Sequence, residues 1–332
     1  MFKSIPSSKV EKGVEVLRLP TTLLAVLFSL SLFAFNSTEW LAHKQVLMRE
    51  AERLQGAYSS FSSKVKTPAE DVLVPVDTFP NGSVKTLVTA SRAQFFPSEG
   101  FVWAKDVLAK DFSEKGVNKS SLSAESCIVD RSTKSGWIQG KAKACHGETE
   151  VSGSQVYVSF AENFVMIYSD AQLVSRDVKK KTSQSVSTNA TIFVKSEKAD
   201  YDRGEGVILM DGSVSFDDGE YSLAADKAWV FLSGTNELKR VVAIGSVAVT
   251  NGLKRGYCDR VVYDREVGNV VMYARTKTEP ARLIDTDPKG GELEGAKIFF
   301  RTDAEQVEVD DPVIKVKTYS HEGSVFPEGR GK

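Results

Sequence analysis

The stretch that most constrains the fold runs from Lys195 to Gly252 and contains one strand pattern twice. Because side chains alternate between the two faces of a β-strand, a period of two places each apolar set on one face. The two copies are Ile208-x-Met210-x-Gly212-x-Val214-x-Phe216 and Val241-x-Ala243-x-Gly245-x-Val247-x-Val249. Short units with one apolar face each cannot bury that face alone, so the pattern predicts that they stack.

A second motif recurs from Ser83 onward and extends this prediction to the whole body. It consists of a small residue, often a basic residue two positions later, and then an apolar or aromatic pair. Its seven copies begin at Ala90, Ala124, Ser152, Ser196, Ala225, Cys258 and Gly295. Turn-forming sequences such as Asp217-Asp218-Gly219 lie between the strands. We therefore predict an all-β, repeat-built body.

The N-terminal part of the chain predicts a membrane helix. Residues 19–38 contain no charged side chain in 20 positions, which is the length that crosses a hydrocarbon core of about 30 Å. Basic residues within 1–18 predict a cytoplasmic N-terminus, with the bulk of the chain outside the cytoplasm. A cleaved signal peptide is the alternative, but Leu32 is a poor residue at position −3 if cleavage follows Ala34.

The rest of the chain divides by composition. Residues 39–82 predict a helical stalk, over Glu39–Phe61, followed by a proline-containing linker. The polar insert Arg176–Asn189 separates a first β-region at 83–176 from a second at 190–320, although one continuous stack is the alternative. Residues 321–332 predict a flexible tail.

The sequence predicts neither catalysis nor a cofactor or metal. It contains no nucleophile elbow, phosphate loop or His-Glu-x-x-His motif. The carboxylate pairs Asp217-Asp218 and Asp310-Asp311 are typical of turns and strand ends. Its three cysteines, Cys127, Cys145 and Cys258, form no Cys-x-x-Cys motif. Cys127 and Cys145 could pair if their strands are neighbours, and otherwise all three are small buried thiols.

Charge and residue size narrow the function further. The 43 basic residues balance the 44 acidic ones, so no basic field for nucleic acid is expected. Small and medium apolar residues face one way on every predicted strand. This face is either filled by its own side chains or open as a groove for acyl chains. The end strands of such a stack can accept a strand from another molecule.

At these same residues the chain resembles the lipopolysaccharide-transport β-jellyroll family, which includes the OstA-like domains of LptA, LptC and the LptD N-terminus. The resemblance is carried by Ala199–Asp202, Gly206–Val214, Leu223–Ala228 and Val242–Val247. The N-terminal apolar segment is similar to the anchor of LptC in particular. Family members like LptC have one jellyroll, whereas this body is long enough for two.

The resemblance implies a function in outer-membrane biogenesis. The body would be a periplasmic, inner-membrane-anchored bridge that holds the acyl chains of lipopolysaccharide, or a related glycolipid, in a β-jellyroll groove. An inner-membrane ABC exporter would load it, and another jellyroll protein would receive the lipid by edge-to-edge strand pairing. The groove candidates are Ile208, Met210, Val214, Phe216, Val241, Ala243, Val247, Val249, Val165 and Ile167.

Two other hypotheses fit the same pattern. A structural or scaffolding β-solenoid of the envelope would have a dry core and bind no amphiphile. A polysaccharide-active β-helix enzyme would need carboxylates such as Asp217 or Asp310 to converge in a cleft.

Overall fold

The computed structural model describes residues 21–180, 188–219, 221–233, 238–265, 267–287, 290–301, 307–310 and 312–315. The predicted cytoplasmic N-terminus (1–18) and flexible tail (321–332) lie outside these residues. The chain divides into two units, Met1–Glu50 and Ala51–Lys332.

One long helix, α1 (Thr21–Ser62), begins in the first unit and ends in the second. It starts directly after Pro20, contains no proline, and ends before Pro68. Its last 23 or so positions are rich in Leu, Ala, Glu, Gln and Arg, which are strong helix formers. The helix expected over Glu39–Phe61 is part of α1.

The predicted single-pass inner-membrane localisation, with its transmembrane helix at 19–38, is contradicted. Over the residues that the structure describes, no helix combines the length and the apolar character that a membrane span requires. Residues 19 and 20, and the side chains of 21–39, lie outside the description. The prediction used the uncharged run at 19–38 and the basic residues before it. In the structure α1 is one helix of 42 residues, whose second half is rich in charged residues.

The second unit is built from β-strands, which confirms the predicted all-β body. Turn sequences separate the strands, and alternating apolar residues give most of them one buried face. The strands are β1 (Ala69–Thr78), β2 (Val84–Phe96), β3 (Phe101–Phe112), β4 (Asn118–Asp130), β5 (Ser135–His146), β6 (Thr149–Ser159), β7 (Phe164–Lys180), β8 (Thr188–Ser196), β9 (Lys198–Asp202), β10 (Val207–Asp217), β11 (Ser222–Leu232), β12 (Leu238–Asn251), β13 (Lys254–Asp264), β14 (Asn269–Tyr273), β15 (Ala281–Asp285), β16 (Glu292–Gly295), β17 (Lys297–Arg301), β18 (Val307–Asp310) and β19 (Val313–Lys315).

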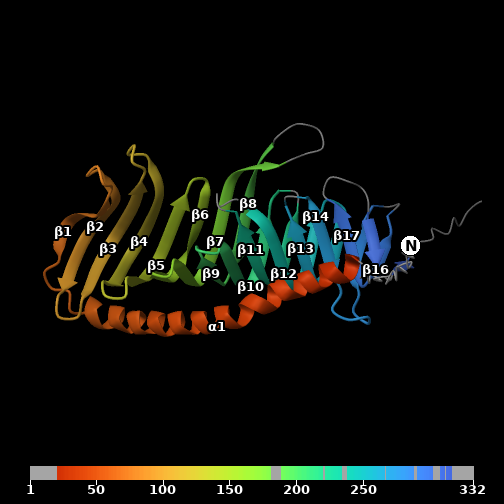
Figure 1. Ribbon diagram of the computed structural model, residues 1–332, viewed down its shortest axis with the longest axis horizontal. Coiled ribbons are helices and arrows are strands. Elements are labelled where there is room, and N and C mark those ends of the chain that lie inside the picture. The colour runs from red at the N-terminus through yellow and green to blue at the C-terminus, as the bar shows by residue number, and fades with distance from the viewer. Residues whose placement is uncertain are drawn as a thin grey trace, which may run out of the picture. The chain divides into compact units, whose positions relative to one another are not determined.

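Pairing follows chain order and is antiparallel throughout (Figure 1). Each strand from β1 to β7 pairs with the next. β7 and β10 both pair with β8 and β9, and the stack continues through β11, β12 and β13. It ends in two branches, β14–β17–β18 and β15–β16–β19. Pairing therefore continues across the polar insert between the two predicted β-regions.

Most long strands bend once, and the bend divides the sheet into two halves. In β10 the register shifts between Asp211 and Val214, where Gly212 has φ 81° and Ser213 has φ 49°. β12 bends in the same way at Gly245. Positive φ suits glycine because it has no Cβ. We call the half that includes Val207–Asp211 the helix-side half and the half that includes Val214–Asp217 the opposite half.

The recurring small-residue motif lies at these bends. Its first residue is buried at Ala124, Ser196 and Ala225. In these three copies the second residue is acidic and covers the bend glycine of a neighbouring strand. A Cβ built on Gly140, Gly212 or Gly245 would lie 2.2, 2.7 or 2.3 Å from the nearest side-chain atom of Glu125, Glu197 or Asp226. The motif therefore fixes the line along which the sheet folds over.

Residues Ala51–Ser62 of α1 pack on the outer face of the helix-side half. Phe61 contacts Phe96 and Phe101, with ring centroids 4.8 and 5.1 Å apart. Arg53 donates to Asp130 at 2.6 Å. The outer face beside these contacts is apolar, since a ladder of directly paired residues runs through Trp103, Ile128, Trp137, Tyr157 and Met166, all of them buried. We call it the outer ladder.

The Arg53–Asp130 pair anchors the helix. Burial raises the pKa of Asp130, but hydrogen bonds from Ser132 and Arg53 outweigh burial and hold the pKa below its ordinary value. A lowered carboxyl pKa means that this contribution to stability is complete above the ordinary Asp pKa and is lost as the pH falls through the lowered one.

We expect Arg53→Ala to loosen α1 from the sheet. It removes one charged hydrogen bond to a carboxylate that is only 5% exposed, which should reduce the free energy of unfolding by about 1–3 kcal/mol. Hydrogen exchange across residues 51–62 should rise at pH 7. The control is Lys85→Ala, which breaks the half-exposed Lys85–Asp77 pair and should leave the exchange of residues 51–62 unchanged, because exposed ion pairs contribute little to stability. Equal exchange in both variants would contradict the anchoring role.

The register excludes the Cys127–Cys145 pairing that the sequence left open. Their strands β4 and β5 are neighbours, but Cys127 lies opposite Ile138 and Cys145 lies opposite Ser121. All three cysteines are free. Burial raises the pKa of Cys127 and of Cys258 to about 12.

Candidate lipid-binding groove

The inner face of the folded sheet carries unbroken apolar ladders, in which each residue lies directly opposite the next on the neighbouring strand. The helix-side inner ladder has an apolar residue on every strand that it crosses. It runs through Ala69, Ala93, Ala104, Cys127, Ile138, Val156, Ile167, Ala199, Met210, Ala228, Ala243, Val261, Met272, Ile298 and Val309.

Two further ladders run parallel to it. The rim ladder lies nearer the free edge of the helix-side half and contains Val158, Val165, Tyr201, Ile208, Val230, Val241, Tyr263, Val270 and Phe300. The opposite inner ladder contains Val88, Ala109, Leu122, Ala144, Val151, Leu173, Val194, Phe216, Leu223, Val249, Gly256, Leu283 and Leu293.

The structure brings all ten predicted groove residues to this inner face. Nine belong to one hydrophobic core, and Val165 is partly buried against it. Ile138, Val156, Leu173 and Val194 occupy equivalent inner positions in earlier strands, although they were not among the groove candidates. Their signal was the same alternation, but it is interrupted there by polar residues and lacks the repeated Gly-x-Val.

The interior is tightly closed toward β13 and more accessible toward β2. Phe216, Leu223 and Val249 of the opposite inner ladder are buried. On the same ladder Leu122 and Val151 are half-buried, and Ala144 is exposed. An inward-facing apolar row that becomes exposed is expected of an open groove rather than a filled sandwich.

Three aromatic residues lie where the free edges of the two halves meet. Phe216 and Tyr221 come from the opposite half, and Tyr263 comes from the helix-side half. The rings of Tyr221 and Tyr263 stack with centroids 6.4 Å apart, and Phe216 meets Tyr263 edge-on at 6.5 Å. We call these residues the mouth cluster.

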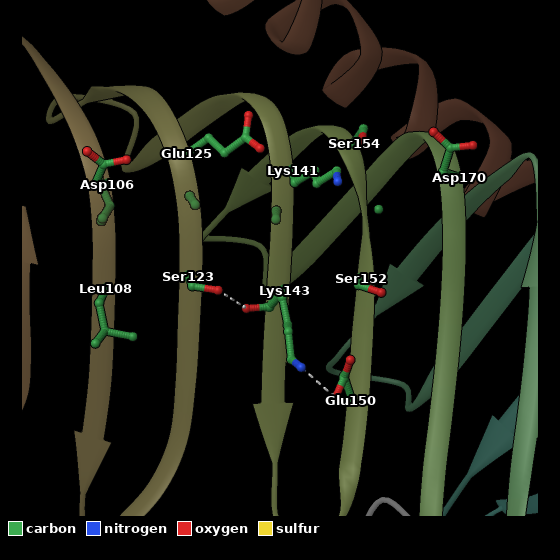
Figure 2. Close-up of a pocket in the computed structure, with 14 residues that line it drawn as sticks. Asp106, Leu108, Ser123, Glu125, Lys141, Lys143, Glu150, Ser152, Ser154 and Asp170 are labelled. Carbon is green, nitrogen blue, oxygen red and sulfur yellow. Dashed lines mark hydrogen bonds and ion pairs between the residues drawn. The ribbon is translucent and has the colours of Figure 1, made fainter.

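A separate depression of about 730 Å³ lies near the bend on β3–β7. Figure 2 shows charged and hydroxyl side chains along it. Lys143 pairs with Glu150 at 2.8 Å, and Arg176 approaches the same carboxylate. Asp106, Glu125 and Asp170 add exposed carboxylates. This mixed charge does not suit an acyl chain.

The predicted carboxylate pair Asp217-Asp218 lies at the turn between β10 and β11. Asp217 accepts hydrogen bonds from Gly219 N and Ser222 Oγ, and Asp218 accepts one from Tyr221 N. Asp310 ends β18, and Asp311 lies outside the described residues. The side chains of Asp217 and Asp218 therefore stabilise the turn between β10 and β11.

Residues 193–306 match the family model described as LptA/(LptD N-terminal domain) LPS transport protein. The resemblance to the lipopolysaccharide-transport family is confirmed. The matched segment runs from β8 to the region after β17 and holds eight of the ten groove candidates, all but Val165 and Ile167. β1–β7 lie before it.

A solved structure similar to this chain is LptH, the LptA homologous periplasmic component of the conserved lipopolysaccharide transport device from Pseudomonas aeruginosa. The sequences are 17% identical, the match covers 38% of this chain and 95% of that chain, and the TM-score is 0.34. No curated protein matches the chain.

Proposed function

We propose that this chain is a segment of a lipopolysaccharide-transport bridge. The acyl chains of lipopolysaccharide, or of a related glycolipid, would lie along the inner ladders while the sugars and phosphates stay outside. The observation that carries the proposal is the continuity of these apolar ladders through the segment that matches lipopolysaccharide-transport proteins. Because each strand adds one apolar residue to each ladder, a chain could move along the stack without crossing a polar step.

The ends of the stack suggest the partners. β1 pairs only with β2 among the described strands, and it exposes Leu73, Val74 and Val76. An apolar edge strand with unpaired backbone groups favours addition of a strand from another molecule. We propose that another jellyroll protein pairs at an end of the stack, and that an ABC exporter supplies the lipid.

A scaffold with a dry core is the second candidate function. It is favoured by the close packing toward β13, where Met272 would lie 2.7 Å from a Cβ built on Gly256. A filled interior of this kind would leave no room for an acyl chain unless the halves separate.

Site-specific photocrosslinking separates the two functions. A photoreactive residue would replace Met210, Phe216, Val247 or the more accessible Leu122, in cells making labelled lipopolysaccharide. Exposed Lys239 is the control position. We expect lipid adducts at the inner positions and none at residue 239. Normal folding with no adduct at any inner position would favour the dry scaffold.

A further inference from the structure

The mouth cluster closes the groove from two sides. Phe216 and Leu223 have the same inward orientation on paired strands of the opposite half, and Tyr221 precedes Leu223 by two positions. Tyr263 lies on the rim ladder between Val241 and Val270. The ring contacts therefore join the free edges of two sheet halves that are otherwise connected at the bend.

The turn that carries Tyr221 is held as one piece. Asp217 and Asp218 bond its backbone and Ser222, and Asp218 N donates to Tyr221 O at 3.1 Å. A movement of this turn would carry Tyr221 with it rather than rotate the ring alone. The two halves are joined at the bends of β10 and β12, at Gly212 and Gly245, where the pairing register is interrupted.

The chemistry of the cluster suits the boundary of an amphiphile. Tyr221 and Tyr263 are half-buried against the core, so each presents an apolar ring and a polar hydroxyl at the same place. Toward β2 the interior is already accessible at Ala144, whereas at β10–β13 these rings cover it.

We propose that Phe216, Tyr221 and Tyr263 form a latch over the groove. Separation of Tyr221 from Tyr263 opens the mouth sideways, so that acyl chains move in or out while a sugar or phosphate headgroup remains outside. This inference rests on the proposed function and adds the place and the side chains through which the lipid passes.

A reducible bridge across the mouth tests the latch. The full chain would carry Tyr221→Cys and Tyr263→Cys with Cys145→Ser and Cys258→Ser, since these two native cysteines are partly exposed and Cys127 is buried. A short bis-thiosulfonate reagent would link the two new thiols, and mass spectrometry would verify the link. The probe is 11-dansylaminoundecanoic acid, whose fluorescence rises in apolar surroundings. The control pair, Glu197→Cys and Ser213→Cys, replaces side chains that bond at 2.9 Å beside the bend.

We expect the bridge at residues 221 and 263 to slow probe uptake at least tenfold, and reduction to restore the rate in the same sample. The bridge at residues 197 and 213 should leave the rate unchanged. Unchanged uptake with a complete mouth bridge would overturn the latch but not the proposed groove. Failure of the two positions to link would have the same meaning. If the unmodified chain takes up no probe, the proposed function fails instead.

Discussion

Gly245→Ala is expected to reduce the free energy of unfolding by about 2–4 kcal/mol, because it combines backbone strain with overpacking. Gly245 has φ 81°, and an added Cβ would lie 2.3 Å from Asp226 Oδ2 and 3.0 Å from Asp226 Cβ. The carboxylate can rotate away, but the Cβ is fixed to the neighbouring strand. Urea denaturation followed by circular dichroism would measure the loss.

Gly219→Ala is the matched control. Gly219 has φ 82°, yet no atom lies within 4 Å of an added Cβ, so only the backbone strain of about 1–2 kcal/mol remains. The additional loss of stability in Gly245→Ala, compared with Gly219→Ala, should be smaller in a chain that also carries Asp226→Gly, because that change removes the opposing side chain. Equal losses at the two glycines would mean that the acidic residue does not fix the bend.

The sequence was most informative where one period continued for a whole strand. Alternation through Ile208, Met210, Val214 and Phe216 identified the inner face correctly, although Leu209 is buried on the outer face. The same rule holds around Ile138 and Val156. There, however, polar residues such as Gln139 and Gln155 interrupt the apolar set, and the repeated Gly-x-Val is absent.

The bends were harder to foresee. In the sequence Gly212 and Gly245 are ordinary members of an apolar set. In the structure the strand pairing shifts its register at both glycines, and the strands bend there. In earlier strands Asp106 and Asp170 take the same positive φ, and an acidic residue gives no distinct signal because Asp is common in any turn.

Helix α1 shows the limit of hydropathy. Residues 19–38 satisfied the length rule for a membrane span, yet no helix over the described residues has the length and apolar character of one. Arg53 and Tyr58 bond to residues of the sheet that lie 68 or more positions away in the sequence. Phe61 packs against rings of β2 and β3. Pairings at such separations are set by the folded sheet and leave no local pattern.

Met210→Ala is expected to destabilise the chain by about 2–5 kcal/mol, the usual cost of emptying a buried methionine site. Met210 is 1% exposed on the helix-side inner ladder. If acyl chains occupy this interior, lauric acid should fill the vacated space and raise the melting temperature of the variant, because a ligand that binds only the folded state stabilises it.

Met166→Ala provides the comparison that gives this result its meaning. Met166 is 2% exposed but lies on the outer ladder. The two methionine sulfurs have similar polar neighbours, since Tyr168 Oη lies 3.9 Å from Met166 Sδ and Ser196 Oγ lies 3.8 Å from Met210 Sδ. The two substitutions should therefore cost a similar amount, also about 2–5 kcal/mol. Stabilisation by lauric acid should favour Met210→Ala, because only this variant enlarges the space between the two halves. The same rise in both variants would indicate non-specific filling of cavities, and no rise in either would favour a dry core.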